Sequence, residues 1–89
     1  MPRYFFNVLD DALPDLQGTE LAGLNIARDE ALRLAGAVIK ERPETFWNAK
    51  RWSMEVCDDA GLLLFALTLA ATEMPSAKVV PYQRNLGGL

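Results

Sequence analysis

The segment from Met54 to Leu69 constrains the fold more than any other part of the chain, because it has the pattern of a single β-hairpin. Residues 54–57 (MEVC) show the period of two expected of a strand with one buried face. Residues 58–61 (DDAG) then provide an aspartate that starts a turn and a glycine that accepts a positive φ. The pattern therefore predicts two antiparallel strands joined by a tight turn.

A four-residue loop also fixes the register of this hairpin. It predicts three cross-strand pairs, which are Cys57 with Leu62, Val56 with Leu63, and Met54 with Phe65. The alternative is a second helix over residues 62–73, since leucine and alanine are strong helix formers. Turn residues placed directly after an alternating strand favour the hairpin.

The length of the chain limits how such a fold can be stabilised. A chain of 89 residues forms one domain, and a domain of this size buries only about 60–65% of its unfolded surface. One cysteine excludes an internal disulfide, and without histidine a zinc site would have only that thiol and carboxylates as ligands, which argues against one. Oligomerisation is the remaining way for so small a domain to bury more surface.

Charge and hydropathy argue against three further classes of protein. A net charge of −3, with scattered basic residues, argues against a protein that binds nucleic acid by neutralising phosphates. The apolar stretch at the N-terminus is too short for a signal peptide. The longest apolar run, residues 62–71, is far shorter than the ~20 residues of a membrane helix. We therefore expect a cytoplasmic protein that does not enter membranes.

The rest of the chain supplies a helix and further strands. Residues 4–9 predict a first strand, and residues 19–21 predict a brief one. Apolar residues three and four positions apart predict a helix from Leu24 to Glu41 that stops before Pro43. Residues 44–47 predict one short turn, and strands follow over 51–57 and 62–70.

The predicted fold class is α+β, with a small antiparallel β-sheet of three to four strands in β-β-α-β-β order. One long helix packs on one face of this sheet. Residues 1–72 form the domain, and residues 73–89 form a C-terminal tail that is extended or disordered. The predicted core consists of Tyr4, Phe6, Val8, Ala27, Ala31, Leu34, Val38, Met54, Val56, Leu63, Phe65 and Leu67.

Four segments, in this order and spacing, resemble a known family. They are MPRYFFNV at residues 1–8, PDLQGTEL at 14–21, LNIARDEA at 24–31 and EVCDDAG at 55–61. Over residues 1–70 the chain resembles the small bacterial domain-of-unknown-function family numbered 6894. The resemblance implies a small α+β unit with turn glycines at Gly18 and Gly61, and no activity or cofactor. Members often carry histidine at Asn7 and a polar residue at Leu62, so this chain departs from the family at both positions.

Residues with reactive side chains have structural explanations in this sequence. Cys57 lies next to acidic residues rather than the cation that activates a thiol. Asp10, Asp11 and Asp15 lack the ligand spacing of a calcium loop, and Asp58 with Asp59 suits turn hydrogen bonding better than acid–base catalysis. The aromatic residues Phe6, Phe46, Trp47 and Trp52 are better explained as core than as a ligand pocket. We therefore predict no catalytic, cofactor or metal site.

The strongest positive signal is apolar surface on the sheet. Strand alternation places Phe5, Leu62, Leu64 and Ala66 on the face opposite the helix, where polar residues are expected. These four residues are the candidate interface, and either a second subunit or the tail would cover them. A face-to-face dimer and an edge-to-edge dimer both remain open.

The predicted function is a non-catalytic protein-interaction or self-associating module, most simply a homodimer, with no cofactor. The alternative is an antitoxin-like regulatory module that binds a partner protein, with or without DNA, an idea that rests on analogy of fold alone. The scattered charge argues against its DNA-binding half. An enzyme is not expected, because the required side chains are missing.

Overall fold

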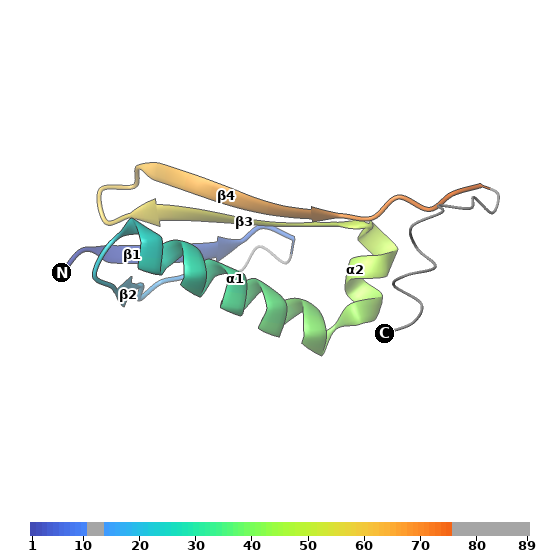
Figure 1. Cartoon of the computed structure of the whole chain (residues 1–89), viewed down its shortest axis with the longest axis horizontal. Coiled ribbons are helices and arrows are strands. Elements are labelled where there is room, and N and C mark those ends of the chain that lie inside the picture. Colours follow the sequence, from blue (N-terminus) through green and yellow to red (C-terminus); the bar gives the residue numbers. More distant parts are fainter. Residues whose placement is uncertain (11–13, 76–89) are drawn as a thin grey trace, which may run out of the picture.

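A computed structural model describes residues 1–10 and 14–75, in which the chain forms four strands and two helices (Figure 1). The sheet is antiparallel with strand order β2-β1-β3-β4, and the helices lie on one side of it. The predicted tail from residue 76 onward lies outside the described residues. The elements are β1 (Arg3–Val8), β2 (Thr19–Glu20), α1 (Leu24–Glu41), α2 (Pro43–Ala49), β3 (Arg51–Asp58) and β4 (Leu63–Ala70).

This arrangement confirms the α+β class and the four-stranded antiparallel sheet, and it corrects the element order. Two helices stand between the strand pairs, so the order is β-β-α-α-β-β rather than β-β-α-β-β with one long helix. The single turn predicted near residue 44 is a seven-residue helix, α2, which begins with Pro43. Proline suits this position because the first helical N–H has no partner within the helix.

The hairpin of β3 and β4 forms as predicted, but its register is different. The Asp58 N–H donates to the Leu62 carbonyl at 3.1 Å, and the Asp58 carboxylate accepts from the N–H groups of Ala60 and Leu62, each at 2.9 Å. Gly61 has a φ of 83°, as the turn requires. Asp58 rather than Cys57 therefore lies opposite Leu62.

An irregularity in the ladder at Val56 and Cys57 adds a second offset to this register. Val56 lies opposite Phe65 instead of Leu63, and Met54 lies opposite Leu67 instead of Phe65. Two one-residue offsets restore the alternation of side chains, because the period of a strand is two. Phe65 consequently still faces the helix side.

The core lies between α1 and the central strands β1 and β3. Small residues on α1 let the helix approach the sheet closely, and Ala27 and Ala31 have no exposed surface. Leu34, Val38, Phe65 and Leu67 are half-buried against this core. Predicted core residue Leu63 is 53% exposed, because it pairs with Cys57 on the other face. The buried residues are Tyr4, Phe6, Val8, Ala27, Ala31, Ala35, Phe46, Trp52, Met54 and Val56.

We expect Gly18→Ala to destabilise the protein more than Gly61→Ala does. Both glycines have left-handed φ, 72° and 83°, where a Cβ costs about 1–2 kcal/mol. At Gly18 the new Cβ would also lie 2.8 Å from Cε2 of Phe5, whereas no described atom lies within 4 Å at Gly61. Urea unfolding should show a loss of about 2–3 kcal/mol for Gly18→Ala and about 1 kcal/mol for Gly61→Ala. Equal losses would contradict the close packing of Phe5 on this loop.

Candidate functional site

The four residues of the candidate interface do not form one patch in the structure. Phe5 lies on β1, half-buried beside Gly18, and β3 separates it from β4. Leu62 is 62% exposed just before β4, and Ala66 is exposed opposite Glu55. Leu64 is half-buried and packs against the core on the helix side, because the ladder is irregular at this point. Strand alternation across an irregularity therefore gave the wrong side for Leu64.

Of the carboxylates for which the sequence predicted no site role, Asp15 and Asp58 make structural hydrogen bonds. Asp58 holds the hairpin turn, and Cys57 accepts a weak hydrogen bond from Asn7 Nδ2 at 3.7 Å. Asp10 is exposed, and Asp11 lies outside the described residues. Among the described residues, no group of three histidine, cysteine, aspartate or glutamate side chains is placed to hold a metal ion.

Asp15 closes the loop that leads from β1 to β2. Its Oδ2 accepts a hydrogen bond from the Phe6 N–H at 3.1 Å, which occupies the edge of β1 beyond the end of β2. Its Oδ1 accepts from the N–H groups of Gly18 at 2.9 Å and Gln17 at 3.2 Å. The Asp15 N–H in turn donates to Asn7 Oδ1 at 2.8 Å. This carboxylate is therefore a clamp on the loop, not a free catalytic group.

The same contacts shift the ionisation of Asp15. Partial burial acts to raise its pKa, but hydrogen bonds from the backbone of Gly18, Phe6 and Gln17 outweigh this effect. The nearby Arg3 cation acts in the same direction as those hydrogen bonds, so the pKa lies below its ordinary value of 3.8. The ionised form is therefore the one that stabilises the folded loop.

We expect Asp15→Ala to lower the free energy of unfolding by about 1–3 kcal/mol at pH 7. Because the folded pKa is depressed, the stabilisation by Asp15 is complete above its unfolded pKa, near 3.8, and declines as pH falls through the folded value. Urea titrations from pH 7 to pH 2.5 should therefore show the difference from wild type narrowing below about pH 4. Asp59→Ala, at an exposed turn position, is the control, and a difference that does not vary with pH would contradict this role.

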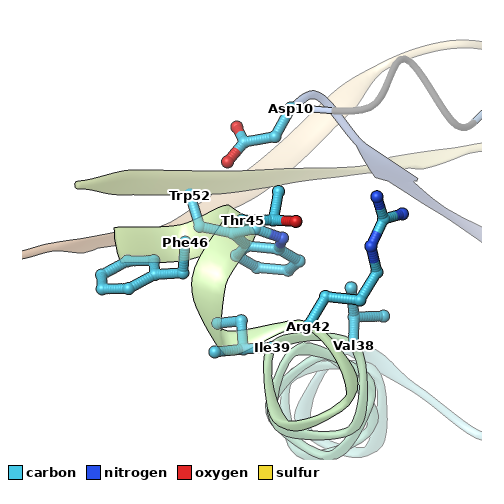
Figure 2. Close-up of a pocket in the computed structure, with 7 residues that line it drawn as sticks. All are labelled: Asp10, Val38, Ile39, Arg42, Thr45, Phe46 and Trp52. Carbon is cyan, nitrogen blue, oxygen red and sulfur yellow. The ribbon is translucent and has the colours of Figure 1, made fainter. Parts of the chain in front are cut away.

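The aromatic residues fill the end of the core rather than line a binding site. Figure 2 shows the Trp52 indole at the centre of a pocket, with Phe46 to one side and Arg42 to the other in this view. The cavity there is ≈ 10 Å³, about the room needed for a single water molecule. Phe6, Phe46 and Trp52 are buried, while Trp47 is 54% exposed. The structure thus supports the interpretation of these residues as core, except at Trp47.

A larger apolar depression lies between α1 and β4, and we call it the α1–β4 groove. It arises because the buried alanines of α1 pack with β1 and β3, which leaves the helix-side residues of β4 incompletely covered. Two adjoining hollows of ≈ 460 and ≈ 260 Å³ share Leu32 and Leu67. The principal lining residues are Leu24, Arg28, Leu32, Gly36, Leu64, Phe65, Leu67 and Leu69.

The α1–β4 groove is apolar and open to solvent. Leu24 is 46% exposed, Leu32 is 62% exposed and Leu69 is 46% exposed. The sequence did not predict this surface. The spacing of apolar residues shows which face of a helix is buried, but it does not show over which strands of the sheet that helix lies. One signal was present, since Leu32 directly follows Ala31 and therefore lies beside the alanine stripe rather than on it.

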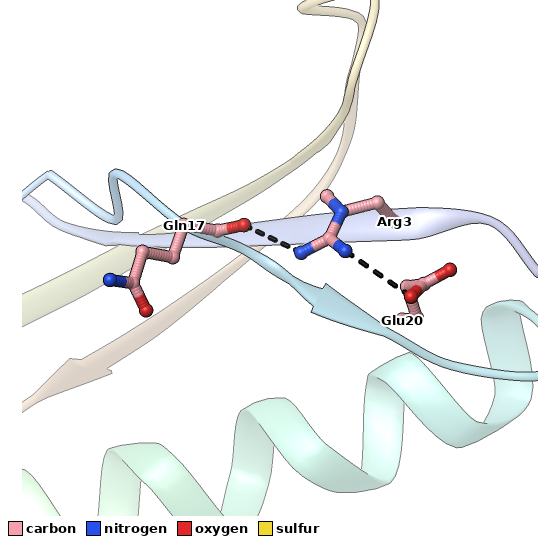
Figure 3. Close-up of polar contacts among 3 residues, drawn as sticks. All are labelled: Arg3, Gln17 and Glu20. Carbon is pink, nitrogen blue, oxygen red and sulfur yellow. Dashed lines mark hydrogen bonds and ion pairs between the residues drawn. The ribbon is translucent and has the colours of Figure 1, made fainter.

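The two edges of the sheet differ sharply. At one edge, β2 has two residues, and Figure 3 shows Arg3 donating to the Gln17 carbonyl at 2.7 Å and pairing with Glu20 at 3.2 Å. Short length and charge are common ways to protect an edge strand from pairing with another chain. That edge is therefore protected.

The opposite edge, β4, has neither kind of protection along most of its length. It is eight residues long, and the chain carries no charged residue between Asp59 and Glu73. A long apolar edge strand is a template for pairing with another strand. The α1–β4 groove and this edge share the residues of β4, so together they form one continuous surface, which we call the β4 surface.

Comparison with known proteins places this fold in a family. The family model described as Domain of unknown function (DUF6894) matches residues 3–70, from the first residue of β1 to the last residue of β4. No curated protein and no solved structure matches the chain. In the described part of the chain, neither helix has the length and apolar character needed to cross a membrane. With all four strands and both helices inside the matched span, the chain belongs to the DUF6894 family of domains of unknown function.

Proposed function

We propose that this domain is a non-catalytic, self-associating protein-interaction module that acts through the β4 surface. The observation that carries the proposal is the exposed, charge-free edge strand β4 beside an open apolar groove. Exposed apolar surface of this kind marks sites of association, because burying it releases the free energy of the hydrophobic effect. Asp15, Asp58 and Cys57 are engaged in the structural contacts above, and Asp10 and Asp59 are exposed in turns, which fits a binding role.

The proposal moves the interface away from part of the predicted patch. Ala66 and Leu62 remain at or beside the β4 surface, and Leu64 joins it from the helix side. Phe5 is set apart, since its ring lies against the loop at Gly18. We place the module in the bacterial cytoplasm, where the single free thiol of Cys57 suits the reducing conditions.

Light scattering coupled to size-exclusion chromatography tests this function. We expect wild type to elute at twice the chain mass of 9.9 kDa, and Leu69→Glu to shift the population to monomer. Leu16→Glu is the matched control, because Leu16 is 86% exposed on the loop beside β1 and its variant carries the same added charge. A wild-type monomer at all accessible concentrations would overturn the proposal.

The same chromatogram distinguishes the antitoxin-like alternative. A module of that type would carry DNA or bind it on addition, which raises absorbance at 260 nm relative to 280 nm. The net charge of −3 gives such binding little electrostatic support. Co-elution with DNA at physiological salt would favour the alternative over simple self-association.

A further inference from the structure

The backbone direction of β4 can be worked out from two hydrogen bonds. The Ser53 carbonyl accepts from the Leu9 N–H at 3.0 Å, so the Ser53 backbone faces β1. In an antiparallel sheet successive residues direct their backbone groups to opposite sides. Trp52 and Met54 therefore face β4, and the 3.0 Å bond from the Ala71 N–H to the Lys50 carbonyl agrees with this phase.

The register then shows which groups on β4 reach the free edge. Leu69 lies opposite Trp52 and Leu67 lies opposite Met54, so these two leucines direct their backbone groups toward β3. The alternate residues Ala66, Thr68 and Ala70 direct theirs away from the sheet. Each offers one N–H donor and one C=O acceptor along an edge with which no strand in the described residues pairs.

Side-chain size on β4 follows the same alternation. The residues that present backbone to the edge are small, and their side chains lie on the face opposite α1, alongside Ser53 and Glu55. The large residues Phe65 and Leu67 lie on the helix side, where they line the α1–β4 groove. A strand that pairs with this edge would therefore find only small side chains at the residues that form its hydrogen bonds. On the helix side it would cover large apolar side chains.

We infer that two copies of this chain associate edge to edge, by antiparallel pairing of β4 with β4 about a two-fold axis at Leu67. The inference rests on the proposed self-association and specifies its geometry. In such a pair, residues whose N–H and C=O groups point to the free edge must lie opposite one another. The two-fold axis must therefore pass through a residue, near the middle of the strand, and not between two residues. An axis at Leu67 sets Leu67 opposite its own copy and Phe65 opposite Leu69, so each of these three large residues finds an apolar partner.

A second copy fits this edge better than an unrelated strand for two reasons. The strand carries no charge, so two identical edges meet without placing like charges opposite each other, although each chain has a net charge of −3. The side chains of β4 are also self-complementary about the two-fold axis. Ala66 lies opposite Thr68 on the face away from α1, and large apolar residues meet on the helix side. The result is a continuous sheet in which each α1–β4 groove adjoins its copy.

Disulfide trapping in full-length protein tests this geometry. In a Cys57→Ser background, Leu67→Cys places two thiols at a non-hydrogen-bonded pair, where Cα atoms stand about 4.5 Å apart. That separation is within the range for a disulfide. We expect Leu67→Cys to form a covalent dimer on mild oxidation, seen on non-reducing gels. Ala66→Cys and Thr68→Cys should cross-link far less, because their own copies lie about 7–8 Å away on the diagonal.

The possible outcomes distinguish the geometry of the β4–β4 pair from self-association itself. Leu16→Cys, at an exposed position on another edge, gives the level of random collision. A light-scattering dimer that cross-links at Ala66 or Thr68 instead of Leu67 overturns the two-fold register. A dimer that cross-links at none of the three overturns pairing about an axis in the middle of β4. A monomer by light scattering overturns the proposed self-association itself.

Discussion

Trp52→Ala should remove about 3–5 kcal/mol from the free energy of unfolding. Trp52 is 5% exposed at the start of β3 and belongs to the buried core together with Phe46 of α2. Trp52 also lies beside Ile39 of α1, so this one side chain packs between the sheet and both helices. A domain of 89 residues has a total stability of only about 5–13 kcal/mol. We therefore expect a large fall in the urea concentration at the midpoint of unfolding, measured by far-UV circular dichroism.

Trp47→Ala is the matched control for this experiment. Trp47 is 54% exposed, and its ring meets Phe46 edge-on at a centroid distance of 5.6 Å. We expect a loss of about 1 kcal/mol or less, from that aromatic contact. Similar losses for the two variants would contradict the assignment of Trp52, and not Trp47, to the core. Because self-association raises apparent stability, both variants must be compared at the same protein concentration.

Ala66→Pro should weaken the dimer about 100-fold while leaving the subunit folded. The N–H of Ala66 faces the open edge of β4, so proline there removes no bond to β3, and proline is tolerated on edge strands in this orientation. In the dimer each copy loses one donor and leaves a carbonyl unpaired, which costs about 3 kcal/mol in total, or a factor of about 100 in the dissociation constant. Light scattering over a dilution series measures this shift.

Leu67→Pro provides the contrast, because the N–H of Leu67 faces β3. Proline at this position removes a hydrogen bond inside the sheet and should destabilise the subunit by about 3 kcal/mol or more. The two variants differ by a single step along the strand, so their opposite effects report the phase of the backbone directly. If Ala66→Pro unfolds the protein as Leu67→Pro does, the edge assignment is wrong.

The parts of the fold that local chemistry determines could be predicted from the sequence. The turn at Asp58–Gly61 was predictable because aspartate and glycine each have a specific role in such a turn, and the structure contains both. The helix bounds, Leu24–Glu41, follow from the apolar period and from Pro43. The register did not follow, because an extra residue in one strand leaves no mark in a continuous apolar run such as LLLFAL.

For the candidate site, too, the sequence predicted the residue types but not their tertiary placement. The sequence pointed to apolar excess at Leu62, just before β4, and at Leu64 and Ala66 on β4, but not to the side on which each residue lies. That depends on the irregularity near Cys57 and on where α1 lies across the sheet, which are tertiary properties. The sequence predicted Phe46 and Trp52 as core residues, but it predicted only a turn where the helix α2 carries Phe46 into the core.

The strand order has a consequence for the synthesis of this protein. β1, made first, occupies an interior position of the sheet between β2 and β3, and its principal partner β3 ends at Asp58. β3 and β4, in contrast, are joined by one short turn and can pair within about 1–10 μs of emerging. Ribosomes add about 5–20 residues per second, so β1 waits for seconds with one edge unpaired. Folding of the domain is thus completed late, when the C-terminal hairpin leaves the ribosome and receives the strand that was made first.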